Sequence, residues 1–129
     1  MSTPIHQDVT FKASPERVYN ALMSSAEFSE LTGAPATISS EVGGPLSLFG
    51  GAIGGRNVEL IPAKRIVQAW QAKDWGEGVY SIARFELSGG TGETHLSFDH
   101  TGFPEGDEDH LAAGWHTNYW EPMQKYLAR

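Results

Sequence analysis

Cysteine is missing from this sequence of 129 residues, so the chain holds no disulfide, no thiolate nucleophile and no cysteine ligand for a metal. Its absence suits a reducing compartment, and we expect a cytoplasmic protein. Long apolar runs are missing too, and no stretch approaches the roughly 20 apolar residues of a membrane-spanning helix. The segment from Met1 to His6 has no basic stretch followed by an apolar run, which predicts that no signal peptide is present.

Basic residues are few, because nine Lys and Arg stand against sixteen Asp and Glu, and the formal charge is −7. Lys64 and Arg65 form the only adjacent basic pair. Such a chain repels nucleic-acid phosphates and anionic lipids, so we expect neither nucleic acid nor a membrane among its partners. The composition, 40% hydrophobic and 19% charged, is typical of a globular protein. The length predicts a single domain over residues 1–129.

The N-terminal part predicts one strand followed by two short helices. Apolar and polar residues alternate over residues 5–11, as in a half-buried strand. Ser14 precedes a proline and an acidic residue, a typical helix start, and an apolar stripe extends this helix over residues 15–23. Ser24 begins a segment with capping-box spacing, which predicts a second helix near residues 25–32.

Between residues 34 and 101, glycine and proline separate short runs that are rich in Val, Ile, Phe and Trp. The connections are too short for crossover helices, so the strands must pair antiparallel. The predicted strands cover residues 36–39, 45–49, 53–62, 64–72, 79–88 and 94–101.

The C-terminal segment, residues 107–128, predicts a long amphipathic helix. At about 100° per residue its apolar side chains fall in one wide arc. The arc consists of Leu111, Ala112, Trp115, His116, Tyr119, Trp120, Met123, Tyr126 and Leu127. Trp115 lies near its centre, so we predict a structural role for this residue. Pro122 cannot donate a backbone hydrogen bond and should kink or divide the helix.

Several motifs in a fixed order carry a resemblance to a known family. They are SPERVYNAL at 14–22, GGAIGG at 50–55, VELIP at 58–62, RIVQAW at 65–70, HTGFP at 100–104 and GW at 114–115. With these motifs the chain resembles the START/Bet v-type (SRPBCC) superfamily. Within it, the chain resembles the branch named after the activator of the heat-shock-protein-ninety ATPase.

The resemblance implies an α+β helix-grip fold, in which a curved antiparallel sheet wraps around the long C-terminal helix and encloses a cavity. Members of the superfamily bind lipids, hormones or polyketides, and some catalyse cyclisation or dehydration. The eukaryotic co-chaperones of the branch pair this domain with a second, N-terminal one, which is absent from this sequence. The function expected first is therefore binding of a small apolar or aromatic molecule. The alternatives are a cavity enzyme of the polyketide cyclase or hydrolase type, and a single-domain co-chaperone.

The candidate ligand-binding residues come from both sides of the expected cavity. They are Phe85, Phe98 and His100 on the strands, His116, Tyr119, Trp120 and Met123 on the last helix, and Arg56 and Trp70, whose directions the sequence leaves open. A histidine could serve as acid, base or hydrogen-bond donor there, and Arg56 could hold an anionic group. Trp75 and Trp115 could extend an aromatic pocket. The competing interpretation is that the aromatic rings fill the interior, with the histidines near the rim and the arginine in solvent.

No motif in the sequence predicts a cofactor, a metal or a catalytic residue. The glycine pairs of residues 50–55 lack phosphate-loop spacing, and they are better explained as bends in a curling sheet. His110 and His116 lie six residues apart, on different faces of a helix, so they cannot share a metal. Asp99 and His100 point to opposite faces of a strand and make a poor dyad.

Overall fold

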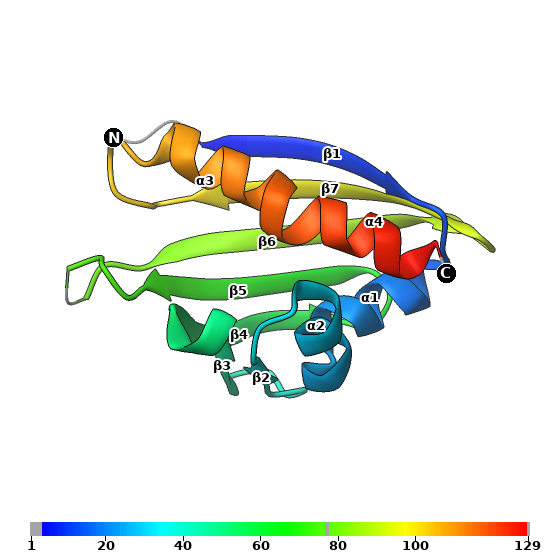
Figure 1. The fold of residues 1–129 in the computed structure, drawn as a ribbon, viewed down its shortest axis with the longest axis horizontal. Coiled ribbons are helices and arrows are strands. Elements are labelled where there is room, and N and C mark those ends of the chain that lie inside the picture. Colours follow the sequence, from blue (N-terminus) through cyan, green and yellow to red (C-terminus); the bar gives the residue numbers. More distant parts are fainter. Residues whose placement is uncertain (1–3, 77, 129) are drawn as a thin grey trace.

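One antiparallel sheet of seven strands carries a long C-terminal helix across one face, as the sequence predicts for a helix-grip fold (Figure 1). The computed structural model describes residues 4–76 and 78–128. The strand order is β1-β7-β6-β5-β4-β3-β2. The strands are β1 (Ile5–Phe11), β2 (Thr37–Ile38), β3 (Pro45–Leu48), β4 (Ile53–Ile61), β5 (Arg65–Ala72), β6 (Ser81–Gly90) and β7 (Glu93–Thr101). A short 3-10 turn, Phe49–Gly51, connects β3 to β4.

Two short helices, α1 (Pro15–Met23) and α2 (Ser25–Thr32), follow the first strand and confirm the prediction. Each begins at a serine whose hydroxyl accepts a backbone hydrogen bond. Ser14 Oγ accepts from the amide of Arg17 at 3.3 Å, and Ser24 Oγ accepts from the amide of Glu27 at 3.2 Å. These bonds satisfy amides that the first turn of a helix leaves unpaired.

The C-terminal helix is continuous but changes its winding. It consists of α3 (Glu108–Trp115), a π-helical turn (His116–Trp120) and α4 (Glu121–Leu127). In the π-helical turn, the amide of Glu121 donates to the carbonyl of His116, five residues back. The sequence predicts a kink or a break at Pro122. The observed irregularity, the π-helical turn, lies just before that residue. The wide turn directs the consecutive side chains of Tyr119 and Trp120 inward, where both are buried.

The core lies between the sheet and the C-terminal helix and is mostly aromatic. Phe85 on β6 is paired with Phe98 on β7, and the two rings lie 5.0 Å apart. Trp120 packs edge-on against both of them. This end of the interior is solid, because Trp120 and Met123 have 1% and 0% of their surface exposed.

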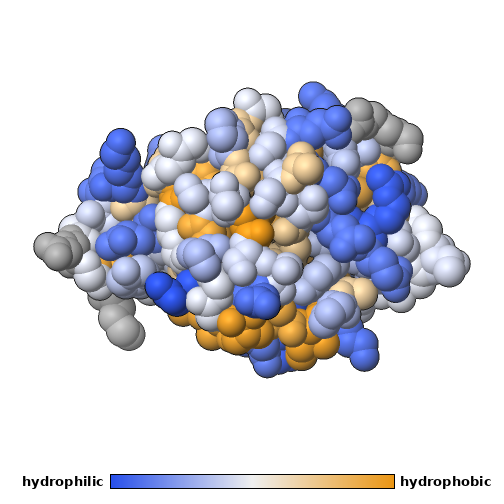
Figure 2. All heavy atoms as spheres, turned by 90° about the horizontal axis from the view of Figure 1, so that it is seen from below, coloured by the Kyte–Doolittle hydropathy of each residue, from blue (hydrophilic) through white to orange (hydrophobic). Residues whose placement is uncertain are grey.

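Some apolar surface stays outside the core. The large apolar residues that are exposed in the described part of the chain are Val42, Val58, Ile61, Tyr80 and Ile82. Figure 2 shows the molecule from below, with apolar atoms gathered at the centre of this face and along its lower border. No described helix is both long and apolar enough to cross a membrane.

Candidate functional site

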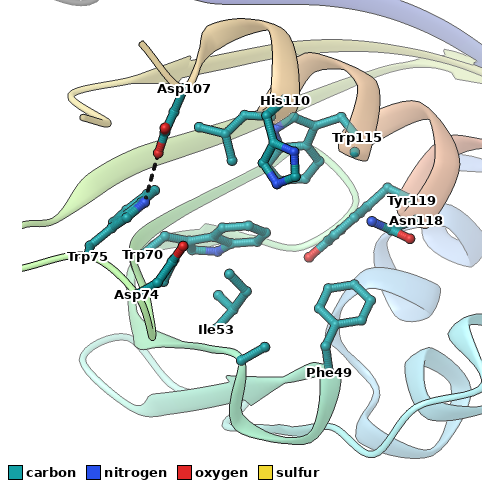
Figure 3. Close-up of a pocket in the computed structure, with 14 residues that line it drawn as sticks. Phe49, Ile53, Trp70, Asp74, Trp75, Asp107, His110, Trp115, Asn118 and Tyr119 are labelled. Atoms are coloured by element: carbon teal, nitrogen blue, oxygen red, sulfur yellow. Dashed lines mark hydrogen bonds between the residues drawn. The ribbon is translucent and has the colours of Figure 1, made fainter. Parts of the chain in front are cut away.

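A half-open pocket of about 430 Å³ lies between α3, the π-helical turn and strands β4 and β5 (Figure 3). Aromatic and small residues form most of its wall. The residues that line it are Phe49, Ala52, Ile53, Trp70, Ala72, Asp74, Trp75, Asp107, His110, Leu111, Gly114, Trp115, Asn118 and Tyr119. They come from both the sheet and the helix, so the pocket is placed where a helix-grip fold separates these two layers.

Stacked aromatic rings make up the inner wall. Trp70 lies on the face of β5 that alternation turns toward the helix, with Ile66 and Gln68. Its indole stacks on that of Trp115, with ring centroids 4.7 Å apart and planes inclined by 27°. The indole N–H of Trp70 donates to Gln68 Oε1 at 2.9 Å, so this buried polar group is satisfied.

Tyr119 contributes a polar atom to this apolar wall. Only 4% of the residue is exposed, and its ring lies 4.4 Å from that of Trp115 and 6.0 Å from that of Phe49. Its hydroxyl points into the pocket, toward the space beside Trp70 and Ile53 (Figure 3). Within the described part of the chain this hydroxyl has no hydrogen-bond partner. Burial raises the pKa of Tyr119 well above 10, so the group remains a neutral hydroxyl that can donate and accept.

Two carboxylates stand at the mouth of the pocket. Asp107 directly precedes α3, and its Oδ2 accepts a hydrogen bond from the indole N–H of Trp75 at 3.1 Å. This bond ties the loop after β5 to the start of α3. Asp74, in the same loop, lies beside Trp70 (Figure 3) and is exposed. Neither lysine nor arginine occurs among the described residues that line the pocket.

His100 lies behind the wall of the pocket and not in it. It is fully buried on β7, where its Nε2 lies 2.7 Å from Ser81 Oγ and its Nδ1 accepts from the indole N–H of Trp115 at 3.1 Å. Because Nδ1 is an acceptor, the proton of the neutral ring is on Nε2 and is donated to Ser81. Burial lowers the pKa of His100 to about 4, so the ring is neutral at pH 7.

The residues that the sequence nominates are distributed over three places. Trp70 and Tyr119 line the pocket, together with Trp75 and Trp115. The nominated residues that are buried but do not line it are Phe85, Phe98, His100, Trp120 and Met123. His116 and Arg56 are exposed.

The expected inward direction of His116 is wrong, and Arg56, whose direction the sequence leaves open, points to solvent. His116 is exposed, because it follows the inward-pointing Trp115 and is turned about 100° away from it. Arg56 is also exposed, and it donates from Nη1 to the carbonyl of Gly43 at 3.0 Å, in the loop before β3. Sequence reasoning missed Phe49, Asp74 and Asp107, which lie in connections that have no periodic pattern.

The comparisons with known proteins agree with this architecture. The family described as Activator of Hsp90 ATPase homolog 1-like protein matches residues 12–128. The Activator of 90 kDa heat shock protein ATPase homolog 1 of Homo sapiens is 31% identical over 116 residues, which are 90% of this chain and 34% of that protein. The chain thus spans about a third of the length of the curated relatives it matches.

Solved structures share the fold over nearly the whole chain. An HSP90 activator from Plasmodium falciparum superposes with a TM-score of 0.92 at 26% identity, over 98% of this chain and 97% of that chain. A protein of the dynemicin biosynthetic locus superposes with a TM-score of 0.82 at 19% identity, over 99% of this chain and 48% of that chain. The second likeness concerns the fold alone.

Proposed function

We propose that this chain, which belongs to the family of Activator of Hsp90 ATPase homolog 1-like proteins, binds a small molecule with an apolar or aromatic body in the pocket between α3 and the sheet. The observation that carries the proposal is the hydroxyl of Tyr119. Among the described residues no fully buried side-chain N or O atom lacks a partner, so this unpaired hydroxyl is reached from the pocket, where a ligand can supply its hydrogen-bond partner. The hydroxyl points into the pocket and not into the packed core.

The walls of the pocket support the same proposal. Small-molecule sites are mostly apolar, with a few polar groups that fix the orientation of the ligand, and typically measure about 300–1,000 Å³. Here Trp70, Trp115 and Phe49 offer flat apolar surface, while Tyr119 and two carboxylates supply the polar groups. Stacking and hydrogen bonds already hold the two tryptophan rings, so little side-chain entropy is lost when a ligand binds.

A pocket-filling substitution tests the proposal. Gly114 lines the pocket, and a Cβ there would meet only Asn118 Nδ2, at 3.7 Å, so a larger side chain enters the open space. We expect Gly114→Leu to lose binding of the neutral dye Nile red, followed by its fluorescence. Ala113→Leu is the matched control, because residue 113 is exposed on the same helix and lies outside the pocket. Equal binding by both variants would refute the pocket as the site.

The natural ligand can be sought directly. Native mass spectrometry of the freshly purified protein should detect a bound small molecule in the wild type and in Ala113→Leu, and lose it in Gly114→Leu. Catalysis is not part of the proposal. The one side-chain hydrogen bond between two described pocket residues joins Trp75 to Asp107, which is not a pair of nucleophile and base.

A second candidate function is binding to a chaperone ATPase of the 90 kDa heat-shock type. The observation that favours it is the likeness to the HSP90 activator from Plasmodium falciparum, which extends over 97% of that chain. We expect the purified protein to raise the ATPase rate of such a chaperone at stoichiometric concentration. Gly114→Leu separates the two candidates, because it should abolish binding of the small molecule and leave the effect on the ATPase unchanged. An unaltered ATPase rate together with no complex in gel filtration would remove this candidate.

A further inference from the structure

We propose that the pocket selects an organic cation, that is, a ligand with an apolar body and a protonated amine or quaternary ammonium group. The inference rests on the proposed function and concerns the same pocket. The apolar body lies along the inner aromatic wall near Tyr119. The positive group lies at the mouth, near Asp74, Trp75 and Asp107.

Charge at the mouth is the first argument. Two carboxylates line the pocket, and no described lining residue is a lysine or arginine. The side chain of Asp74 forms no hydrogen bond or ion pair with the described residues. The carboxylate of Asp107 accepts one hydrogen bond from a described side chain, from the indole N–H of Trp75 to Oδ2. Both groups therefore keep oxygen atoms free for a cation. The pocket is partly shielded from water, where an attraction between opposite charges is stronger than at an open surface.

Aromatic rings beside these carboxylates are the second argument. The face of an indole attracts a cation more strongly than any other side-chain ring. Trp70 and Trp75 both lie at the side of the pocket where the carboxylates stand (Figure 3). The hydrogen bond to Asp107 fixes the ring of Trp75 before any ligand arrives. A ring and a carboxylate on the same side of a pocket distinguish an ammonium group from a neutral group of equal shape.

Two features near the mouth of the pocket disfavour the binding of a cation. Asp107 stands at the N-terminus of α3, whose dipole disfavours a cation, but Glu108 and Asp109 in the first turn offset that partial charge. His110 also lines the pocket and would repel a cation when protonated. Repeating the measurements in His110→Gln removes this second effect.

Three probes of similar size test the proposal at pH 8 and low salt. Benzyltrimethylammonium is the cation, neopentylbenzene is its neutral isostere, and phenylacetate is the anion. Binding is followed by the indole N–H signals in ¹H–¹⁵N spectra. We expect the cation to bind about tenfold more tightly than its isostere, as a partly desolvated cation–π contact beside a carboxylate allows. The preference should weaken in high salt.

The variants separate charge from shape. Asp74→Asn and Asp107→Asn should each reduce the affinity for the cation several-fold and leave the affinity for neopentylbenzene unchanged. In Asp107→Asn the amide oxygen of the new side chain can still accept from Trp75, so the wall is preserved. Asp109→Asn is the matched control, because it removes one negative charge at the same end of α3 outside the pocket. Equal or weaker binding of the cation than of the isostere overturns this inference alone. Failure of all three probes to shift any pocket tryptophan overturns the proposed function as well.

Discussion

The indole N–H of Trp115 donates to Nδ1 of His100 across 3.1 Å, so a residue of the last helix fixes the tautomer of a histidine on β7. The other ring nitrogen then donates to Ser81 Oγ at 2.7 Å. A protonated His100 would carry hydrogens on both nitrogens and would turn one of them against the indole N–H. The ring thus joins helix and sheet only while it is neutral.

Protonation of His100 should make the protein sensitive to acid. Its pKa is about 4 in the folded protein and near 6.5 when unfolded. The unfolded state therefore binds the proton first, and stability is complete above pH 6.5 and falls as the pH drops from 6.5 toward 4. The loss from this group is about 3 kcal/mol at most. Urea unfolding at pH 7.0 and 4.5 measures it. His100→Gln should flatten the slope, and His116→Gln, at an exposed position, should not; an unchanged slope in the first variant contradicts the prediction.

Removal of the Trp115 side chain should destabilise the whole fold. The residue is 3% exposed, and its ring contacts those of Trp70, Phe98 and Tyr119. Trp115→Ala should cost about 3–5 kcal/mol, which is a large part of a total of roughly 5–15 kcal/mol. Trp115→Phe should cost less, since it keeps an aromatic ring, although it loses the bond to His100 and part of the buried volume of the indole. Denaturant unfolding followed by circular dichroism gives both values, and a Trp115→Ala protein of wild-type stability would show that the residue is not structural.

Gly114→Ala should stabilise the protein and weaken binding in the pocket. Alanine is a better helix former than glycine by about 1 kcal/mol, and the new methyl group meets no atom closer than 3.7 Å. Its melting temperature should therefore rise while its affinity for Nile red falls. Gly33→Ala is the contrasting variant, because residue 33 ends α2 at a φ of 75°, where alanine is strained. A lower melting temperature for Gly114→Ala would contradict this account.

His6 should titrate above the usual range. The pKa of His6 is raised by its hydrogen bond to the carboxylate of Asp99 at 2.8 Å and by the bond to Asp8 at 3.0 Å. The contribution of His6 to stability is thus complete below pH 6.5 and is lost as the pH rises through the folded pKa, opposite to His100. NMR titration of the ring should show the pKa moving back toward 6.5 in Asp99→Asn. Glu41→Gln, in the loop between β2 and β3 at the opposite edge of the sheet, should leave the pKa of His6 in place.

The strands and helices could be predicted from the sequence because a helical or strand period, or glycine and proline at the boundaries, marks each of them. Alternation places Phe85 and Phe98 on one face, and both are buried. The wide helical arc correctly includes Trp115 and Tyr119 but also His116, since a projection cannot tell how much of an arc the sheet covers. The π-helical turn could not be predicted, because it depends on the packing of Tyr119 and Trp120 against rings from the sheet.

The sequence predicts aromatic residues in the wall of the pocket but not the residues at its mouth. Trp70, Trp75 and Tyr119 stand out as aromatic residues, and the fold implies a space between helix and sheet. The mouth could not be derived, because Asp74 and Asp107 belong to two loops that meet only in the folded chain. Their proximity depends on the bond from Trp75, which links residues 32 positions apart.

The pairing of β1 with β7 sets the order in which a newly synthesised chain can fold. Ile5 pairs with His100 and Phe11 with Thr94, and β1 has no other neighbour in the described sheet. On the ribosome, β1 is therefore made first and waits until β7 has emerged, and the C-terminal helix that covers both follows later still. Pairing across such a distance in sequence is slow. The apolar face of β1 therefore stays uncovered until synthesis of the domain is almost finished, and an uncovered strand of this kind is prone to aggregation.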